Sequence, residues 1–187
     1  LDPTSLAMLE GDREVTGVYP VRIAYPAQTG ATANVTPSAV SGLSVPGLDG
    51  TGVTVALLDT GVDPSHPYLR DSVLPGLDLI NPGSGGIAQP HPTIPGRPER
   101  HATELAGIVT GSDGPGGLHG VAPGSTILPI RIAGWQPNAE GGYTVYSRTD
   151  QIIAGLESAV DPNGDGDVMD AARIALGRIE GLADKVA

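Results

Sequence analysis

The chain has 187 residues, enough for one domain with a hydrophobic core or for part of a larger one. Its formal net charge of -11 opposes binding to the phosphate backbone of nucleic acids and to anionic membrane surfaces, and no segment has the ~20 apolar residues that span a bilayer. Because cysteine is absent, disulfides and cysteine-based zinc sites are excluded. We expect neither nucleic acid nor a membrane as a partner.

The first quarter of the chain predicts little regular structure. Val15–Tyr25 contains several residues that favour strands, but Pro20 interrupts them and limits the segment to an edge strand. Residues 26–49 are mostly small and polar, which is typical of a linker. A boundary is therefore expected between an arm of residues 1–45 and a domain of residues 46–187.

The clearest predicted strand is Val53–Leu58, a nearly unbroken apolar run between glycine-containing turns. Such a run is typical of a strand that is buried on both faces of a parallel sheet. Asp59 follows at its carboxyl end, where open α/β sheets place ligands and chemistry. The alternative is that Asp59 only caps the turn at Thr60 and Gly61.

Strands and helices alternate in the rest of the chain, and Gly111 stops the first helix. Alternation of this kind predicts an α/β fold with parallel βαβ units. The expected elements are a strand at Val73–Ile80 broken by Pro75-Gly76, a loop over 81–98, a helix from Ala102, a strand at Thr126–Ile132, a helix over Thr149–Val160 capped by Thr149, and a short strand at Arg173–Leu176.

His101 lies at the start of the first predicted helix, 42 residues after Asp59. One sheet crevice can bring the two side chains together. A carboxylate bonded to one imidazole nitrogen leaves the other nitrogen able to take a proton from a nucleophile, which is two thirds of a serine-hydrolase triad. The alternative is a histidine that serves only as a polar helix cap.

Three blocks of the sequence, in order, resemble the subtilisin-like serine proteases. The segment from Gly52 to Pro67, centred on Asp59, resembles the aspartate block of that family. The segment from His101 to Gly111 looks like its histidine block, and Gly120–Ile132 is similar to the strand that follows. The resemblance implies a subtilisin-like three-layer fold with a mainly parallel sheet, present only in part.

The resemblance also implies roles for individual residues. Asp59 would orient the imidazole, and His101 would act as general base and then as general acid. Polypeptide substrates would bind as an added strand between two edges. The residues that match these edges are Gly141, Gly142 and Tyr143 on one side and Ala175, Leu176 and Gly177 on the other.

The family resemblance further implies an extracellular protein with an inhibitory propeptide. Val15–Pro26 looks like the last strand of such a propeptide, so cleavage is expected within residues 27–45. Residues 1–45 would then contain the propeptide tail and the arm at the start of the mature protein.

One departure from the family concerns the nucleophile. No Gly-Thr-Ser-x-Ala block occurs in the sequence. We therefore expect an N-terminal part of the catalytic domain, inactive alone, whose partner is the C-terminal remainder of that domain. The usual His-Gly-Thr-His is here His101-Ala102-Thr103-Glu104, which leaves open an inactive subtilase-like module that binds peptides.

A second motif predicts calcium as a cofactor. Oxygen ligands at alternate positions, with glycine at the sixth, are what a calcium loop requires, and Gly166 occupies that sixth position. Ala172 stands where an EF-hand has glutamate, so Asp170 is a substitute ligand. The alternative is a solvated acidic turn. The candidate ligands are Asp161, Asn163, Asp165, Asp167 and Asp170.

Two other enzyme classes share features with this sequence. Asp59-Thr60-Gly61 matches the motif of aspartic proteases, but those folds are almost wholly antiparallel and need a second such motif, which the sequence lacks. A metal hydrolase would use histidine and glutamate side chains as metal ligands, but the spacing of the candidates fits no ligand motif. The preferred interpretation is that they are scattered surface residues. The candidates are His66, His91, His101, Glu104 and His119.

Overall fold

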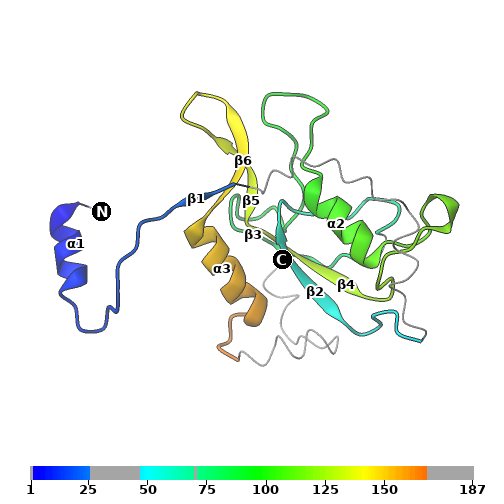
Figure 1. The fold of residues 1–187 in the computed structure, drawn as a ribbon, viewed down its shortest axis with the longest axis horizontal. Helices are drawn as coiled ribbons and strands as arrows, with labels where there is room; N and C mark the ends of the chain where they lie inside the picture. The colour runs from blue at the N-terminus through cyan, green and yellow to red at the C-terminus, as the bar shows by residue number, and fades with distance from the viewer. Residues whose placement is uncertain (1, 26–46, 70, 168–187) are drawn as a thin grey trace.

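The computed structural model describes residues 2–25, 47–69 and 71–167 (Figure 1). Within these ranges the strands form two sheets of three, ordered β2-β4-β3 and β1-β6-β5. The helices are α1 (Pro3–Glu10), α2 (His101–Thr110) and α3 (Thr149–Val160), with a short 3₁₀ turn at Pro115–Gly117. The strands are β1 (Ile23–Ala24), β2 (Thr54–Asp59), β3 (Leu77–Asp78), β4 (Thr126–Arg131), β5 (Ala133–Pro137) and β6 (Tyr143–Arg148).

The sheet β2-β4-β3 is parallel, as the alternation of elements predicted. β2 pairs with β4 from Thr54 opposite Thr126 to Asp59 opposite Arg131, so Asp59 ends its strand. β2 packs on both faces, as predicted, with Val55 and Leu57 against one hydrophobic cluster and Ala56 and Leu58 against another. It is only half-buried, however, because it lies at the edge of the described sheet. The fully covered strand is the central β4.

Pro129 is tolerated in the central strand because it lacks its N–H at a point where the hydrogen-bond ladder to the neighbouring segment is interrupted. Ile127, two residues earlier and therefore facing the same neighbour, donates its N–H to the Ser72 carbonyl. Along that side, the ladder breaks at Pro75-Gly76, where β3 pairing has not yet begun. The strand predicted over Val73–Ile80 is accordingly reduced to an isolated bridge at Val73 and the short β3.

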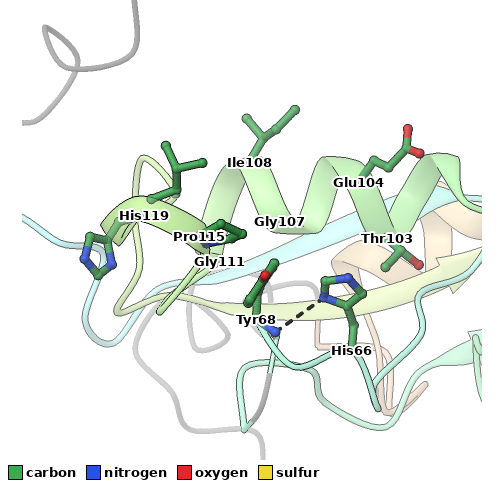
Figure 2. Close-up of a pocket in the computed structure, with 12 residues that line it drawn as sticks. His66, Tyr68, Thr103, Glu104, Gly107, Ile108, Gly111, Pro115 and His119 are labelled. Atoms are coloured by element: carbon green, nitrogen blue, oxygen red, sulfur yellow. Dashed lines mark hydrogen bonds between the residues drawn. The ribbon is translucent and has the colours of Figure 1, made fainter. Parts of the chain in front are cut away.

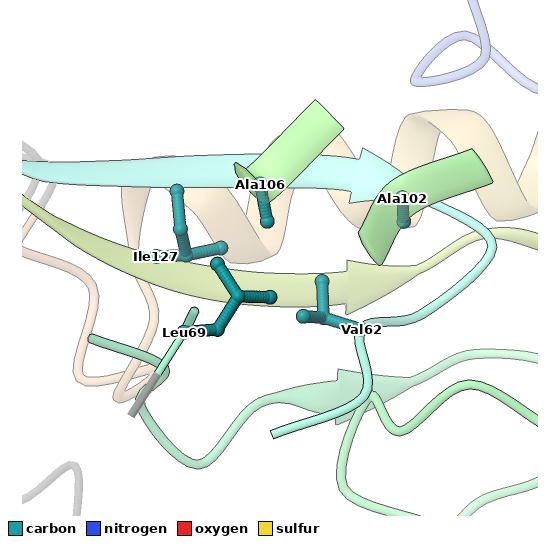
Figure 3. Packing of buried hydrophobic residues seen from close by; sticks show 5 residues of the cluster. All are labelled: Val62, Leu69, Ala102, Ala106 and Ile127. Atoms are coloured by element: carbon teal, nitrogen blue, oxygen red, sulfur yellow. The ribbon is translucent and has the colours of Figure 1, made fainter. Parts of the chain in front are cut away.

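Helices cover both faces of this sheet, which gives the three layers that were predicted. On one face, α2 packs its buried Ala102 and Ala106 against Ile127 of β4 and against Val62 and Leu69 (Figure 3). On the other face α3 contributes Ile152 and Ala159 to a second cluster. The buried members of that second cluster, all on β4 or directly after it, are Leu128, Ile130 and Ile132.

The antiparallel hairpin of β5 and β6 was not predicted. Trp135 pairs with Val145, and the tip is closed by Asn138, whose side chain accepts the N–H of Gly142 at 2.8 Å. β1 adds to the free side of β6, with Ala24 opposite Ser147. The edge strand predicted within Val15–Tyr25 is thus present, but it spans only Ile23–Ala24.

The predicted bounds of the last helix are confirmed, but Thr149 is not its cap. Thr149 is the first residue of α3. Its hydroxyl accepts the N–H of Arg22 at 3.0 Å, while its own N–H donates to the Arg22 carbonyl at 2.9 Å. Gln151 accepts the N–H of Arg148 at 2.9 Å at the start of the helix. Thr149 therefore joins the N-terminal segment to the domain.

Two helical glycines allow a matched test of packing. A Cβ on Gly155 in α3 would lie 2.5 Å from Cγ2 of Ile132, whereas a Cβ on Gly107 in α2 would meet nothing within 4 Å. We expect Gly155→Ala to lower the free energy of unfolding by about 1–3 kcal/mol because the core is overpacked. Gly107→Ala should raise it by up to ~1 kcal/mol. Thermal unfolding measures both, and equal shifts of Tm would contradict the packing.

Besides the candidate ligand Asp170 and the candidate substrate edge over 175–177, two predicted segments fall on residues that the structure does not describe. They are the linker, apart from its last residues 47–49, and the strand over Arg173–Leu176. Among the helices of the described ranges, none is long and apolar enough to cross a membrane.

Candidate functional site

Asp59 and His101 meet at the carboxyl end of the parallel sheet. Nδ1 of His101 lies 2.9 Å from Oδ1 and 2.8 Å from Oδ2 of Asp59. The carboxylate comes from the end of β2, and the imidazole comes from the first residue of α2. The fold thus brings together two side chains that are 42 residues apart in sequence.

Backbone contacts hold the two elements in this arrangement. The N–H of Thr60 donates to Oδ1 of Asp59 at 2.6 Å, and the Thr60 hydroxyl accepts the N–H of Ala102 at 3.3 Å. One residue further along α2, the Thr103 hydroxyl accepts the N–H of Asp63 at 3.0 Å. The start of α2 is therefore bonded to the loop that follows β2 at two successive points.

The pair differs sharply in exposure. The side chain of Asp59 is 14% exposed and that of His101 is 63% exposed. With Nδ1–H donated to the carboxylate, the lone pair of Nε2 is available on the solvent side, and the described residues form no hydrogen bond with it. This is the tautomer in which an imidazole can accept a proton from a hydroxyl group.

A cavity of about 710 Å³ opens beside the pair. Its walls are mainly apolar, contributed by the parallel sheet and by the hairpin, and Ala24 and Tyr25 of the N-terminal segment lie along it. Ser147 of β6 also lines the cavity, but its hydroxyl donates to the Arg148 carbonyl at 3.3 Å. The apolar side chains that face the cavity are Leu58, Ile132, Ala133, Trp135 and Val145.

One wall of this cavity is an aromatic cluster centred on Trp135. The ring of His91 packs edge-on against it at 4.4 Å between centroids, and Cζ of Arg97 lies 4.9 Å from its centroid. The ring of Tyr143 also packs edge-on against His91, at 5.9 Å between centroids. Sequence reasoning missed Trp135, although it is the single tryptophan of a chain without phenylalanine.

The residues predicted to bind substrate are placed as follows. Gly141 and Gly142 form the tip of the hairpin, and Tyr143 begins β6. The β6 residues that line the cavity itself are Val145 and Ser147. The opposite edge, Ala175, Leu176 and Gly177, lies outside the described ranges.

The acidic loop after α3 bonds to its own backbone. Asp161 accepts N–H groups from Asp165 at 3.1 Å and from Gly166 at 2.9 Å, and Asn163 also accepts from Asp165 at 3.1 Å. These oxygens are the hard ligands that calcium prefers. Over the part of the chain that is described, however, no group of three or more acidic or histidine side chains is arranged to hold a metal ion. Asp170 lies outside that part.

A second cavity of about 520 Å³ runs along the other side of α2 (Figure 2). His66, Glu104 and His119 line it, but Figure 2 shows His119 at the opposite end from Glu104. These are members of the set considered for a metal hydrolase. The described residues do not gather them into a metal site, and His91 is buried in the aromatic cluster instead.

Among known proteins, the model of the Subtilase family matches residues 50–166. The major intracellular serine protease of Bacillus subtilis (strain 168) is 33% identical over 119 residues, which are 64% of this chain and 34% of that protein. The minor extracellular protease Vpr of the same organism is 33% identical over 121 residues, again 64% of this chain but 14% of the relative. The chain thus spans about a third or less of the length of these relatives.

The crystal structure of fervidolysin from Fervidobacterium pennivorans, described as a keratinolytic enzyme related to subtilisin, is similar to this chain at 30% sequence identity. The match covers 62% of this chain and 16% of that structure, with a TM-score of 0.45.

Proposed function

Because this chain belongs to the subtilase family, we propose that it supplies the aspartate and the histidine of an Asp-His-Ser triad in a serine endopeptidase. The observation that carries the proposal is the contact of 2.8 Å between Nδ1 of His101 and the Asp59 carboxylate. An aspartic protease would need a second carboxylate beside Asp59, and the imidazole of His101 stands in that place instead.

The chemistry proposed for the pair follows from its hydrogen bonds. Nε2 of His101 takes the proton from the attacking serine hydroxyl and later gives it to the leaving amine. Asp59 fixes the tautomer and stabilises the imidazolium that forms between these steps. The serine is proposed to lie in polypeptide outside this sequence, since no described hydroxyl bonds to His101 and the sequence has no Gly-Thr-Ser-x-Ala block.

Polypeptide substrates are proposed to bind as a strand added to β6. The free side of β6 already accepts a strand of this chain, β1, with main-chain pairing at Ser147 and Arg148. Main-chain bonds of this kind give affinity, and pockets for alternate side chains give selectivity. Tyr143 would contact substrate at the far end of β6, with Gly141 and Gly142 at the hairpin tip. The opposite edge is proposed at Ala175, Leu176 and Gly177 from the family resemblance.

Residues 1–45 are proposed to contain the tail of a propeptide and the arm of the mature protein, and residues 46–187 the N-terminal part of the catalytic domain. Two contacts support this assignment. Ala24 and Tyr25 line the cavity that also holds Asp59 and His101, so this segment occupies the position where a substrate is proposed to bind. Tyr25 also packs edge-on against Tyr146 at 6.2 Å.

A fluorophosphonate probe tests the proposal. The full-length protein should react covalently at a single serine outside these 187 residues, and the isolated chain should not react. Peptide mapping of the adduct decides the result, because labelling of Ser147 or of any other serine within this chain would contradict it.

A second candidate function is an inactive subtilase-like module that binds peptides. It is favoured by the added strand β1, since strand addition needs no nucleophile. The same probe separates the two candidates. A full-length protein that binds extended peptides but takes up no fluorophosphonate is such a module.

Calcium is proposed as a structural cofactor of the loop from Asp161 to Asp167. On calcium binding, the side-chain oxygens of Asp161 and Asn163 would give up their hydrogen bonds to loop N–H groups and coordinate the cation instead. We expect removal of calcium with a chelator to lower Tm, because a ligand that binds only the folded state stabilises it. Asp165→Asn should weaken the response, while a Tm that does not change across a calcium titration would refute the site.

An extracellular location is also part of the proposal. The relatives named above include one extracellular and one intracellular protease, so family membership alone does not decide the compartment.

A further inference from the structure

A buried cluster of three charged side chains adjoins the Asp59 and His101 pair through Arg131, which is the register partner of Asp59 on β4. Arg131 donates two hydrogen bonds to Glu99, from Nε at 2.9 Å and from Nη2 at 2.6 Å. Its third nitrogen, Nη1, lies 3.0 and 3.1 Å from the two oxygens of Asp78. The side chain of Arg131 is 3% exposed, and those of Asp78 and Glu99 are fully buried.

The carboxylates of this cluster also bind backbone. Glu99 accepts the N–H of Gln89 at 2.9 Å and the N–H of Trp135 at 3.0 Å. Asp78 accepts the N–H groups of Ile80 at 2.9 Å and of Asn81 at 2.8 Å. Burial acts to lower the pKa of Arg131, but its bonds to Glu99 and the charges of Glu99 and Asp78 outweigh burial and raise that pKa. The guanidinium therefore stays charged.

The cluster also leaves no space for a side chain next to it. A Cβ on Gly134 would lie 2.1 Å from Nη2 of Arg131 and 2.5 Å from Oε1 of Glu99. The corner between β4 and β5 is therefore packed directly on the ion pair, and the position of this corner depends on the pair.

Two of the three residues are tied to the candidate site by position. Arg131 ends β4 and is the register partner of Asp59. Glu99 lies two residues before His101, in the segment that leads into α2. Asp78 contacts the same guanidinium from β3, and its backbone partners are Ile80 and Asn81 in the turn after that strand. Glu99 also lines the cavity that holds Asp59 and His101, whereas Asp78 is not among the residues of that cavity.

We propose that Glu99 is a positioning residue. Arg131 holds Glu99 in place, and Glu99 in turn holds the segment before α2 so that His101 meets Asp59. Glu99 also holds the backbone of Trp135 beside the cavity. The proposal rests on the function proposed above. Glu99 does not touch the reacting atoms. It acts through the chain that carries His101, and through its bond to the N–H of Trp135 it also fixes the aromatic wall.

Glu99→Gln and Asp78→Asn form a matched pair in the full-length protein. Each variant removes one buried carboxylate charge from the same guanidinium and keeps the shape of the side chain. A cluster that only stabilises the fold predicts similar losses from both. A positioning role for Glu99 predicts that Glu99→Gln perturbs kcat and the His101 imidazole more than Asp78→Asn does. The two variants are compared at temperatures equally far below their Tm.

Two readouts are measured with both variants. The first is kcat and KM for a peptide substrate, where Glu99→Gln should lower kcat by about 10–100-fold with a much smaller change in KM, since small misplacements of a catalytic group have effects of this size. Asp78→Asn should stay within about threefold of the unchanged protein. The second is the proton resonance of His101 Nδ1–H, which should shift or broaden in Glu99→Gln and stay in place in Asp78→Asn.

Equal effects of the two variants on kcat, or an unmoved Nδ1–H resonance in Glu99→Gln, would overturn the positioning role. If Glu99→Gln does not fold, Glu99→Asp replaces it with the same readouts, because it keeps the charge but shortens the reach to the Trp135 N–H. If the unchanged protein hydrolyses no peptide, the proposed function fails, and the resonance alone still decides the role of Glu99.

Discussion

Asp59→Asn is expected to lower kcat of the full-length protein by about 10⁴-fold, which is the size of effect seen when a triad aspartate loses its charge. The amide keeps an oxygen for the Thr60 N–H, which now bonds Oδ1 at 2.6 Å. Its NH₂ group, however, donates to Nδ1 where the carboxylate accepted. The imidazole then carries its proton on Nε2 and cannot take one from serine. Steady-state kinetics with a peptide substrate measure the loss.

Asp113→Asn is the matched control for this substitution. Asp113 is an exposed aspartate in the loop after α2, with a φ of 58° that asparagine also adopts readily. It should leave kcat unchanged. Nearly full activity of Asp59→Asn would show that the contact with His101 is not the catalytic pair of this protein.

The Asp59 and His101 contact could be predicted because local signals placed each residue at the end of an element. The apolar run before Asp59 and the glycine after Thr110 mark elements whose bounds the structure matches within one residue. β3, α2 and β4 form a βαβ unit, and β2 runs parallel to β4, so the carboxyl end of β2 and the start of α2 meet at one edge of the sheet.

The cluster of Arg131 with Asp78 and Glu99 could not be predicted in the same way. Its three members come from separate segments, and each is an ordinary charged residue in its own sequence context. Charged side chains are rarely buried, so an arginine at the end of an apolar run gives no local signal that it turns inward. The pairing appears only when β3, β4 and the segment before α2 are placed together.

The hairpin of β5 and β6 was missed for a different reason. Its turn runs from Asn138 to Gly142, longer than the two-residue turns that mark a hairpin most clearly. Trp135 and Tyr143 alternate with smaller or polar residues, a weak signal in a chain so poor in aromatics. The consequence for the site is direct, because this hairpin forms the wall of the cavity and the edge that pairs with β1.

Leu128→Ala is expected to lower the free energy of unfolding by about 2–5 kcal/mol, the range for removing a buried leucine side chain. Leu128 is fully buried in the central strand, on the face that α3 covers. Because domains are commonly stable by only about 5–15 kcal/mol, the cavity left by this truncation would remove a large part of the total stability. Urea unfolding measures the change as a lower midpoint with an unchanged slope.

Ile153→Ala is the control that compares an exposed aliphatic side chain with the buried one. Ile153 lies in α3, next to Ile152 of the core cluster, but its side chain is 56% exposed. Its truncation should change the free energy of unfolding by roughly 0.5 kcal/mol or less, as is usual for surface positions. Similar losses from the two variants would mean that α3 does not pack on the sheet through Ile152 and Ala159. The three-layer arrangement that holds Asp59 and His101 at one edge would then be wrong.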